Sequence, residues 1–178
     1  MTQSTSTSPG VWLSALFFAV SGVLEIALAR GAHAVIEDAP PLSSAIHQVE
    51  EEADAKMVES LAILLPDTPL VTATALTKAL HTLGSVVLAP SADEGGTNLL
   101  LRRPPTSIPA RFGHDSYRKH LQEAAEADVP TAVVEVDELA FDLDLPNDIL
   151  TVLEAGRDTR TLQVCRHLDL RSRIPARA

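Results

Sequence analysis

Short apolar runs alternate with amphipathic segments along this chain, and the alternation predicts its secondary structure. Most runs are apolar throughout rather than at every second position, which is typical of strands that are buried on both faces of a sheet. On this basis strands are expected at 11–20, 32–37, 60–66, 85–90, 97–101 and 131–136.

The segments between these runs show helical spacing. Over 42–57 the apolar residues fall on one face of a helix, and a threonine at 72 or 74 is placed to cap the next helix, which runs to Leu83. Further helices are expected at 23–30, from 115 or 116 to 127, and from Pro146 onward. Strands that alternate with helices predict an α/β fold: a mostly parallel sheet covered on both faces, in three layers.

Composition divides the chain into three parts. Residues 1–10 are small, polar and of low complexity, and we expect them to form a disordered tail. Residues 11–155 carry the alternating pattern without an internal repeat or a linker, so they are expected to form a single domain. Residues 156–178 place arginines among acidic residues and are expected to form a carboxyl-terminal helical tail.

Charge and cysteine content limit the partners and the compartment. The 178 residues have a formal net charge of -10, and nucleic-acid binding requires a basic face, so no nucleic-acid partner is expected. A small nucleotide is still compatible with this charge, because metal ions can neutralise it locally. The single cysteine, Cys165, allows no disulfide within the chain, which favours a reducing, cytoplasmic location.

The apolar segment 11–29 is nearly long enough to span a bilayer. Glu25 interrupts it, small polar residues dilute it, and no lysine or arginine precedes it as a secretory signal would require. A buried strand followed by a helix is therefore favoured over a membrane or signal role.

Acidic residues follow two apolar segments, at the end of the sheet where ligands bind in open α/β folds. Asp67 is held between two prolines, and Asp142 and Asp144 are two positions apart, so that their side chains point the same way on an extended chain. Two carboxylates about 4 Å apart repel by roughly 4 kcal/mol at an effective dielectric of about 20, and a cation removes that penalty. Oxygen ligands suit magnesium or manganese. A helix cap at Asp67 and a solvated acidic loop at the other two are the alternatives.

The stretch PSADEGGTNLLLRRPP, residues 90–105, places a polar glycine loop against an apolar strand. Glycines let backbone N–H groups approach a phosphate closely, although the loop matches neither the dinucleotide nor the P-loop fingerprint. A plain hairpin turn is the alternative. The arginines that follow, Arg102 and Arg103, are expected to be surface counter-charges rather than phosphate ligands.

The stretch FGHDSYRKH, residues 112–120, has a similar organisation. Gly113 precedes Ser116 at the start of a helix, where free N–H groups favour anions. His120 is expected to pack or to orient a ligand, and not to act as a base, because phosphoryl transfer depends mainly on positioning and charge.

Four stretches occur in order along the chain: LPDTPLV, APSADEGGTNLLLRRPP, FGHDSYRKHLQEA and AFDLDLPNDI. Together they resemble the CofC family, the 2-phospho-L-lactate guanylyltransferases of coenzyme F-420 biosynthesis, well over 60–155 and loosely over 23–59. The resemblance implies a nucleotidyltransferase fold of the glycosyltransferase-A-like type. It also implies transfer of GMP from GTP to 2-phospholactate, phosphoenolpyruvate or 3-phosphoglycerate, with release of pyrophosphate.

The resemblance implies roles for individual residues as well. The catalytic carboxylates, which would hold Mg²⁺ as the cofactor, are Asp67, Asp142 and Asp144. The groups that would seat the phospho-acid are the backbone at Thr97 and Gly113 and the hydroxyl of Ser116. The residues that would face the nucleotide are Asp93, Gly95, Gly96 and Asn98. GTP and the phospho-acid would be the partners, and a homodimer is left open.

One part of the family pattern is not found in this sequence. Members begin with a strand, a basic glycine or proline loop and a long helix that help to receive GTP, whereas this chain begins with a serine- and threonine-rich stretch. We therefore expect a complete phospho-acid half and a depleted GTP half. A non-catalytic phosphometabolite-binding homologue is the main alternative, and a nucleotidyltransferase acting on a sugar phosphate or molybdopterin is a weaker one.

Overall fold

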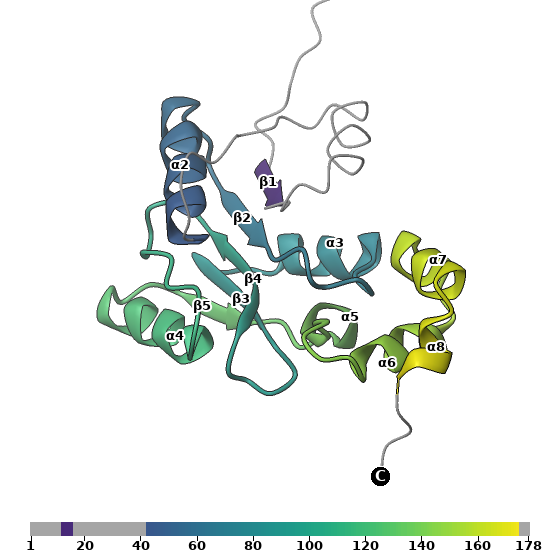
Figure 1. Ribbon diagram of the computed structural model, residues 1–178. Helices are drawn as coiled ribbons and strands as arrows, with labels where there is room; N and C mark the ends of the chain where they lie inside the picture. The colour runs from purple at the N-terminus through teal and green to yellow at the C-terminus, as the bar shows by residue number, and fades with distance from the viewer. Residues whose placement is uncertain (1–11, 16–41, 175–178) are drawn as a thin grey trace, which may run out of the picture.

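The structure is a computed structural model that describes residues 12–15 and 42–174 (Figure 1). The predicted tail at 1–10, the helix at 23–30 and the strand at 32–37 lie outside the described residues, as does most of the apolar segment 11–29. In the part that is described, no helix is long and apolar enough to cross a membrane.

The described elements alternate along the chain much as the pattern predicts. In order they are β1 (Trp12–Ala15), α2 (Leu42–Ala55), β2 (Leu61–Leu64), α3 (Ala73–His81), β3 (Val86–Pro90), β4 (Thr97–Arg102), α4 (Ser116–Glu126), β5 (Thr131–Val133), α5 (Asp137–Ala140), α6 (Asp148–Ala155), α7 (Arg160–His167) and α8 (Leu170–Arg173). The Thr72 side chain caps α3 by accepting a hydrogen bond from the Ala75 N–H, as one of the two expected caps. The short helix α5 was not predicted.

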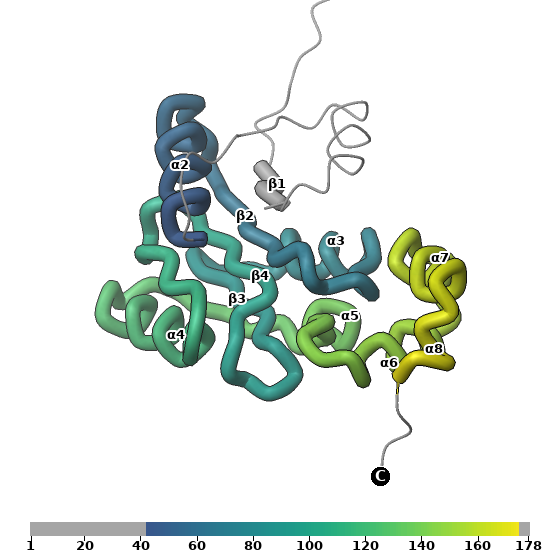
Figure 2. Tube along the Cα trace, in the orientation of Figure 1, coloured from purple at the N-terminus to yellow at the C-terminus, as the bar shows by residue number. Residues whose placement is uncertain are grey.

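The strands form one five-stranded sheet in the order β1-β2-β4-β3-β5. β4 runs antiparallel to both of its neighbours, whereas β1 pairs with β2, and β3 with β5, in parallel. The sheet is therefore mixed, with a reversed strand at its centre. The reason is the connection: residues 91–96 join β3 to β4 directly, and so short a loop permits only an antiparallel pair. Figure 2 traces this loop between the two strands.

Helices cover both faces of the sheet, which gives the expected three layers (Figure 1). On one face, alternate residues of β2, β3 and β4 pack with α3 and α5 in the largest apolar cluster. On the other face, α2 packs against β2, and α4 packs against β3 and β4. The buried apolar side chains among the described residues are aliphatic apart from Cys165, as the low aromatic content requires.

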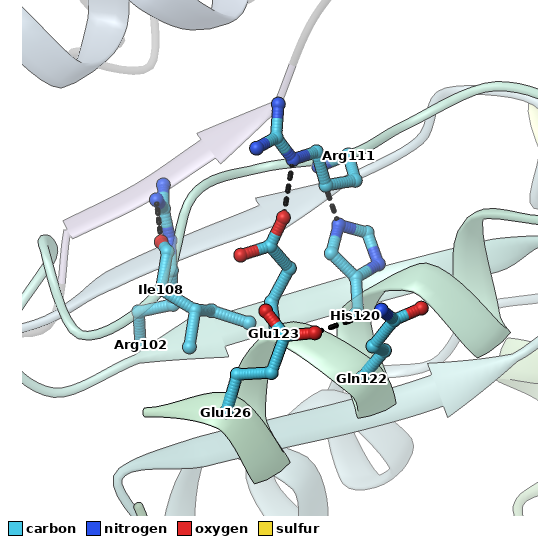
Figure 3. A network of polar contacts seen from close by, with 7 residues as sticks. All are labelled: Arg102, Ile108, Arg111, His120, Gln122, Glu123 and Glu126. Carbon is cyan, nitrogen blue, oxygen red and sulfur yellow. Dashed lines mark hydrogen bonds and ion pairs between the residues drawn. The ribbon is translucent and has the colours of Figure 1, made fainter. Parts of the chain in front are cut away.

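The expectation that Arg102 is a surface counter-charge is wrong. β4 extends one residue further than predicted, and Arg102 pairs with Leu61 in the register, so its side chain is buried on the α2 face at 2% exposure. There its Nη1 donates to the Ile108 carbonyl at 2.9 Å (Figure 3), and its Nη2 lies 2.7 Å from the Glu50 carboxylate of α2. The buried charge is thus paired, as burial demands.

Arg103 is also structural rather than a free surface charge. Its guanidinium donates hydrogen bonds to three carbonyls at and just beyond the end of α3, those of Leu80, Thr82 and Gly84. A cation at the carboxyl end of a helix satisfies carbonyls that have no partner within the helix and favours the helix dipole. Both arginines therefore hold the fold together around β4.

Candidate active site

Asp67 and the segment that carries Asp142 and Asp144 lie side by side. The backbone N–H of Leu143, between the two later aspartates, donates to the Asp67 carbonyl at 2.9 Å. The turn at Asp67 is fixed by Thr68, whose hydroxyl donates to the Leu65 carbonyl at 2.9 Å. Two segments far apart in the sequence thus bring the predicted carboxylates to one place, which we call the carboxylate edge (Asp67, Asp142 and Asp144).

The electrostatics of the carboxylate edge show that these groups repel one another. Burial raises the pKa of Asp67, and the charge of Asp144 raises it further. Burial also raises the pKa of Asp142, followed by the charges of Asp144 and Asp67. In addition, Oδ1 of Asp67 is buried without a hydrogen-bond partner. Such a cluster attracts a cation, which would remove both the repulsion and the unpaired oxygen.

The carboxylate edge is not by itself a complete metal cage. Among the described residues, no group of three or more histidine, cysteine, aspartate or glutamate side chains is close enough to hold one ion. Magnesium commonly takes only one or two protein carboxylates and completes its octahedron with water and phosphate oxygens. The oxygen-only donors and the unpartnered Asp67 oxygen therefore fit magnesium that is shared with a phosphorylated ligand.

Asn98, predicted to face the nucleotide, is buried and supports the carboxylate edge. Its Nδ2 donates to the carbonyls of Leu139 at 2.9 Å and Ala140 at 3.2 Å, at the end of α5. A hydrogen bond from Asn98 also opposes the rise in the pKa of Asp142. Asn98 thus positions the segment that leads into Asp142.

The glycine loop at 91–96 closes on itself. Asp93 Oδ1 accepts hydrogen bonds from the Ser91 hydroxyl at 2.5 Å and from the Gly95 N–H at 2.9 Å, and these bonds lower the pKa of Asp93. The Gly96 N–H donates to the Ser91 hydroxyl at 2.7 Å, and a Cβ at Gly96 would approach that oxygen to 3.0 Å. The Asp93 carboxylate and these glycines therefore fix the shape of the loop, and their contact with a nucleotide stays a prediction.

The start of α4 has the geometry of an anion site. Gly113 has a φ of +107°, which strains any other residue, and a Cβ built on it would meet nothing within 4 Å. Its carbonyl accepts from the N–H of Ser116, the first residue of α4, at 3.1 Å. Ser116 is 2% exposed. Open space beside Gly113 and the positive end of the α4 dipole are features that suit a phosphate or carboxylate.

His120 connects this helix start to β4. It lies one turn after Ser116 on the same face of α4, and it is fully buried. Its Nδ1 is 2.9 Å from the Thr97 hydroxyl at the start of β4, and its Nε2 accepts from the Arg111 backbone N–H at 2.8 Å (Figure 3). We call Thr97, Gly113, Ser116 and His120 the α4 corner.

The α4 corner and the carboxylate edge meet at the first two residues of β4. Neighbouring residues of a strand point to opposite faces. Thr97 reaches α4 through His120, and Asn98 reaches the end of α5 and Asp142. The two groups of residues that the sequence predicted for metal and phospho-acid are thus both connected to the start of β4, from opposite faces of the strand.

The fold has a counterpart among solved structures. A crystal structure described as a nucleotide-diphospho-sugar transferase from Desulfovibrio desulfuricans G20 superposes with a TM-score of 0.61 over 90% of this chain and 75% of that chain. The sequence identity is 15%, so the likeness shows the fold alone. The α/β fold of this chain is therefore like that of this one structure.

The family is narrower than the fold. The family model described as "Guanylyl transferase CofC like" matches residues 13–176, and the chain belongs to this family. The resemblance stated from the four stretches is therefore confirmed, and the match extends beyond both ends of 60–155.

Relatives in the family carry different substrate names. A phosphoenolpyruvate guanylyltransferase from Sphaerobacter thermophilus is 36% identical over 71% of this chain and 62% of its own length. A 2-phospho-L-lactate guanylyltransferase from Haloquadratum walsbyi is 37% identical over 52% of this chain and 29% of its own length. A 3-phospho-D-glycerate guanylyltransferase from Colwellia psychrerythraea is 43% identical over 36% of this chain and 30% of its own length. The chain thus spans less than two thirds of these relatives.

Proposed function

We propose that this chain transfers GMP from GTP to a phosphorylated three-carbon acid, as a step of coenzyme F-420 biosynthesis. A phosphate oxygen of the acid would form a bond to the α-phosphorus of GTP. The bond from that phosphorus to the oxygen bridging to the β-phosphate would break, and pyrophosphate would leave. The observation that carries the proposal is the meeting of the carboxylate edge and the α4 corner at Thr97 and Asn98.

The carboxylate edge is the part that would hold Mg²⁺, through Asp67, Asp142 and Asp144. When bound, the ion would supply positive charge that neutralises the phosphates of both substrates. The residues themselves contribute by bringing negative charge to one point and leaving Oδ1 of Asp67 without a protein partner. The Leu143-to-Asp67 backbone bond and Asn98 keep that geometry fixed before substrates arrive.

The α4 corner is the part that would seat the phospho-acid. The backbone at Thr97 and Gly113 and the Ser116 hydroxyl offer neutral donors, and the α4 dipole favours an anion there. Neutral donors suit a ligand whose charge is already balanced by a metal ion nearby. Phospholactate, phosphoenolpyruvate and 3-phosphoglycerate share a carboxylate and a phosphate, so the proposal is limited to this class of acids. Which of the three is the substrate is determined by the experiment below.

The loop at 91–96 is proposed to face GTP through its backbone. Asp93 and Ser91 are engaged within the loop, so they would act by holding Gly95 and Gly96 in place rather than by touching the nucleotide. A cytoplasmic location and a homodimer remain predictions from the sequence.

The decisive experiment measures pyrophosphate release from GTP with magnesium and each of the three acids in turn. Turnover with one of them, abolished by removing magnesium, is the expected result. Calorimetry of each acid with magnesium runs in parallel. Acid binding without pyrophosphate release would contradict the proposal and favour a non-catalytic homologue that binds phosphometabolites. Turnover with a sugar phosphate but with none of the three acids would contradict the proposed substrate class.

A further inference from the structure

The buried hydrogen bonds of His120 define its protonation. The Arg111 backbone N–H can only donate, so Nε2 of His120 must accept with its lone pair. Burial, followed by the charges of Arg102, Arg111 and Lys119, lowers the pKa of His120 to about 4, so the ring is neutral near pH 7. A neutral imidazole whose Nε2 is unprotonated carries its proton on Nδ1.

The tautomer fixes the role of Thr97. With its proton on Nδ1, His120 donates to the Thr97 hydroxyl oxygen, 2.9 Å away. The oxygen then accepts from His120, and its own proton is free to be donated. Thr97 is 1% exposed, and within the described residues its hydroxyl proton has no recorded acceptor. A buried donor without a partner is costly, and a ligand oxygen would satisfy it.

The helix places that donor beside the proposed phospho-acid seat. Ser116 and His120 are one turn apart on the same buried face of α4, so the residue that holds Thr97 is anchored next to the helix start. The hydrogen bond from the Arg111 N–H also fixes the chain just before Phe112 and Gly113. The ring of Phe112 packs edge-on against His120, with 5.2 Å between the ring centroids. One side chain therefore locks β4, the approach to Gly113, and α4 together.

We propose that His120 is a positioning residue for the phospho-acid: its Nδ1–H holds the Thr97 hydroxyl as a hydrogen-bond donor to an anionic oxygen of the substrate. This inference rests on the proposed function and deepens it. His120 does not touch the substrate and transfers no proton. It acts through Thr97, and it makes the corner a fixed donor set rather than a pair of freely rotating hydroxyls.

The first test needs no substitution. Nitrogen NMR of the imidazole rings in the full chain reports which nitrogen carries the proton. We expect an Nδ1–H signal for His120, assigned by its absence in His120→Gln and unchanged between pH 6 and 8. The substitution distinguishes it from His81, whose Nδ1 lies 2.8 Å from the Thr77 carbonyl and also carries a proton. We also expect its Nδ1 signal to shift when phosphoenolpyruvate and magnesium are added. An Nε2–H tautomer for His120, or no shift on binding, would overturn the proposal.

Two amide substitutions separate the two hydrogen bonds. The amide nitrogen of asparagine is as many bonds from Cα as Nδ1, and the amide oxygen of glutamine is as many as Nε2. His120→Asn can therefore keep the donor to Thr97, and His120→Gln can keep the acceptor for Arg111. We expect His120→Gln to raise the KM for the phospho-acid about tenfold, the size of one hydrogen bond to a charged group, with the KM for GTP unchanged.

Controls decide whether the effect passes through Thr97. His120→Asn should keep the KM for the acid within about twofold of wild type, since the donor to Thr97 remains. His47→Gln is the matched control, because His47 lies on α2 with its side chain 70% exposed. In a Thr97→Val background, His120→Gln should have no further effect on acid binding. Equal losses in the asparagine and glutamine variants, or additive losses with Thr97→Val, would contradict the proposal.

Calorimetry separates this inference from the proposed function. If wild type binds a phospho-acid without turnover, the dissociation constant replaces KM in the same comparison, and the expected tenfold loss in His120→Gln stands. If the acid binds equally well to wild type and to His120→Gln, the inference fails while the proposed function stands. If wild type binds none of the three acids, the proposed function fails, and the substrate role of His120 fails with it.

Discussion

The α4 corner and the carboxylate edge both contact β4, but the polar groups of the first are hydrogen-bonded to each other, whereas those of the second repel one another. In the α4 corner, His120 uses both ring nitrogens, and Thr97 and Ser116 are buried in fixed positions. At the carboxylate edge, burial and mutual repulsion raise the pKa values of Asp67 and Asp142, and an oxygen of Asp67 is left without a partner.

The difference supports the ligand that is proposed for each region. A fixed set of neutral donors is ready for an anion without rearrangement, which is the arrangement that electrostatic preorganisation requires. Repelling carboxylates are costly in the free protein, and a cation relieves that cost when it binds. Substitutions should therefore act oppositely in the two regions: they should destabilise the α4 corner, and they should leave the carboxylate edge folded but inactive.

The largest expected effect is on activity at the carboxylate edge. Asp142→Asn combined with Asp144→Asn should lower the rate of pyrophosphate release by about a thousandfold or more, as expected when charge stabilisation of phosphoryl transfer is lost. The fold should survive, and thermal unfolding should show a melting temperature equal to or above that of wild type, because repulsion is removed. Asp54→Asn, on the exposed face of α2, is the control that removes a carboxylate charge away from this edge. A variant that keeps its activity, or that unfolds, would contradict the metal assignment.

The next effect is on stability at the α4 corner and depends on pH. His120 has a pKa of about 4 in the folded protein and about 6.5 when unfolded. Between these values the unfolded chain binds the proton and the folded protein does not, so stability falls as the pH falls, by roughly 1.4 kcal/mol per pH unit. The charged neighbours that keep the folded value low are Arg102 on β4, Arg111 before α4, and Lys119 on α4.

Urea unfolding at pH 7, 6 and 5 measures this slope. His120→Gln should be less stable than wild type at pH 7 and should have a smaller loss between pH 6 and 5. Asp67 and Asp142 contribute with the opposite sign, since their raised pKa values make the folded protein take up protons first. The pH dependence of the free energy of unfolding is therefore compared between wild type and His120→Gln. If this dependence is the same in both proteins, His120 is not a buried, neutral side chain.

The sequence predicted the layers of the fold and a mostly parallel sheet, but not the reversal of β4 at its centre. Apolar runs identify β2, β3 and β4 because burial on both faces leaves a strong signal. The reversal of β4 depends on the short loop before it, for which a hairpin turn was the alternative interpretation. α5 was missed because its four residues show no full helical period, although two acidic residues in its first turn are a signal for a helix start.

At the candidate site, residue types were easier to predict than their partners. Aspartates at segment ends brought Asp67, Asp142 and Asp144 forward as a group, and their role as metal ligands stays a prediction. Nothing in the sequence says that Asn98 bonds to the end of α5, since that contact depends on the tertiary fold. The bonds of Asp93 to Ser91 and Gly95 are local, and an aspartate just before glycines in a loop is a signal for them that the prediction did not use. Arg102 was misplaced because charged residues are usually exposed, and only the extra residue of β4 turns it inward.

A smaller effect is expected from the backbone of the α4 corner. Gly113→Ala places a Cβ in open space but at a φ of +107°, so its cost is conformational strain of about 1–3 kcal/mol without a steric clash. Gly95→Ala is the matched control, since Gly95 has no such φ and its nearest neighbour is the Asp93 carboxylate at 3.3 Å. Urea unfolding should show the larger loss for Gly113→Ala, and equal losses would remove the argument that Gly113 is required by its conformation.

The smallest expected effect tests whether the α4 corner depends on the Arg111 backbone or on its side chain. The Arg111 Nε donates to the Glu123 carboxylate at 2.6 Å, but this pair lies on the surface, with the Arg111 side chain 53% exposed. Exposed ion pairs contribute about 0–1 kcal/mol, so Arg111→Ala should change the free energy of unfolding by less than about 1 kcal/mol. The substitution retains the backbone N–H that fixes Nε2 of His120, so the Nδ1–H tautomer and the KM for the phospho-acid should both be those of wild type.

Because the Arg111 charge helps, after burial and Arg102, to lower the pKa of His120, that pKa should rise in Arg111→Ala. A tenfold higher KM for the acid with an unchanged tautomer would show instead that the guanidinium binds the acid directly, and the α4 corner would then be a charged site rather than a neutral donor set.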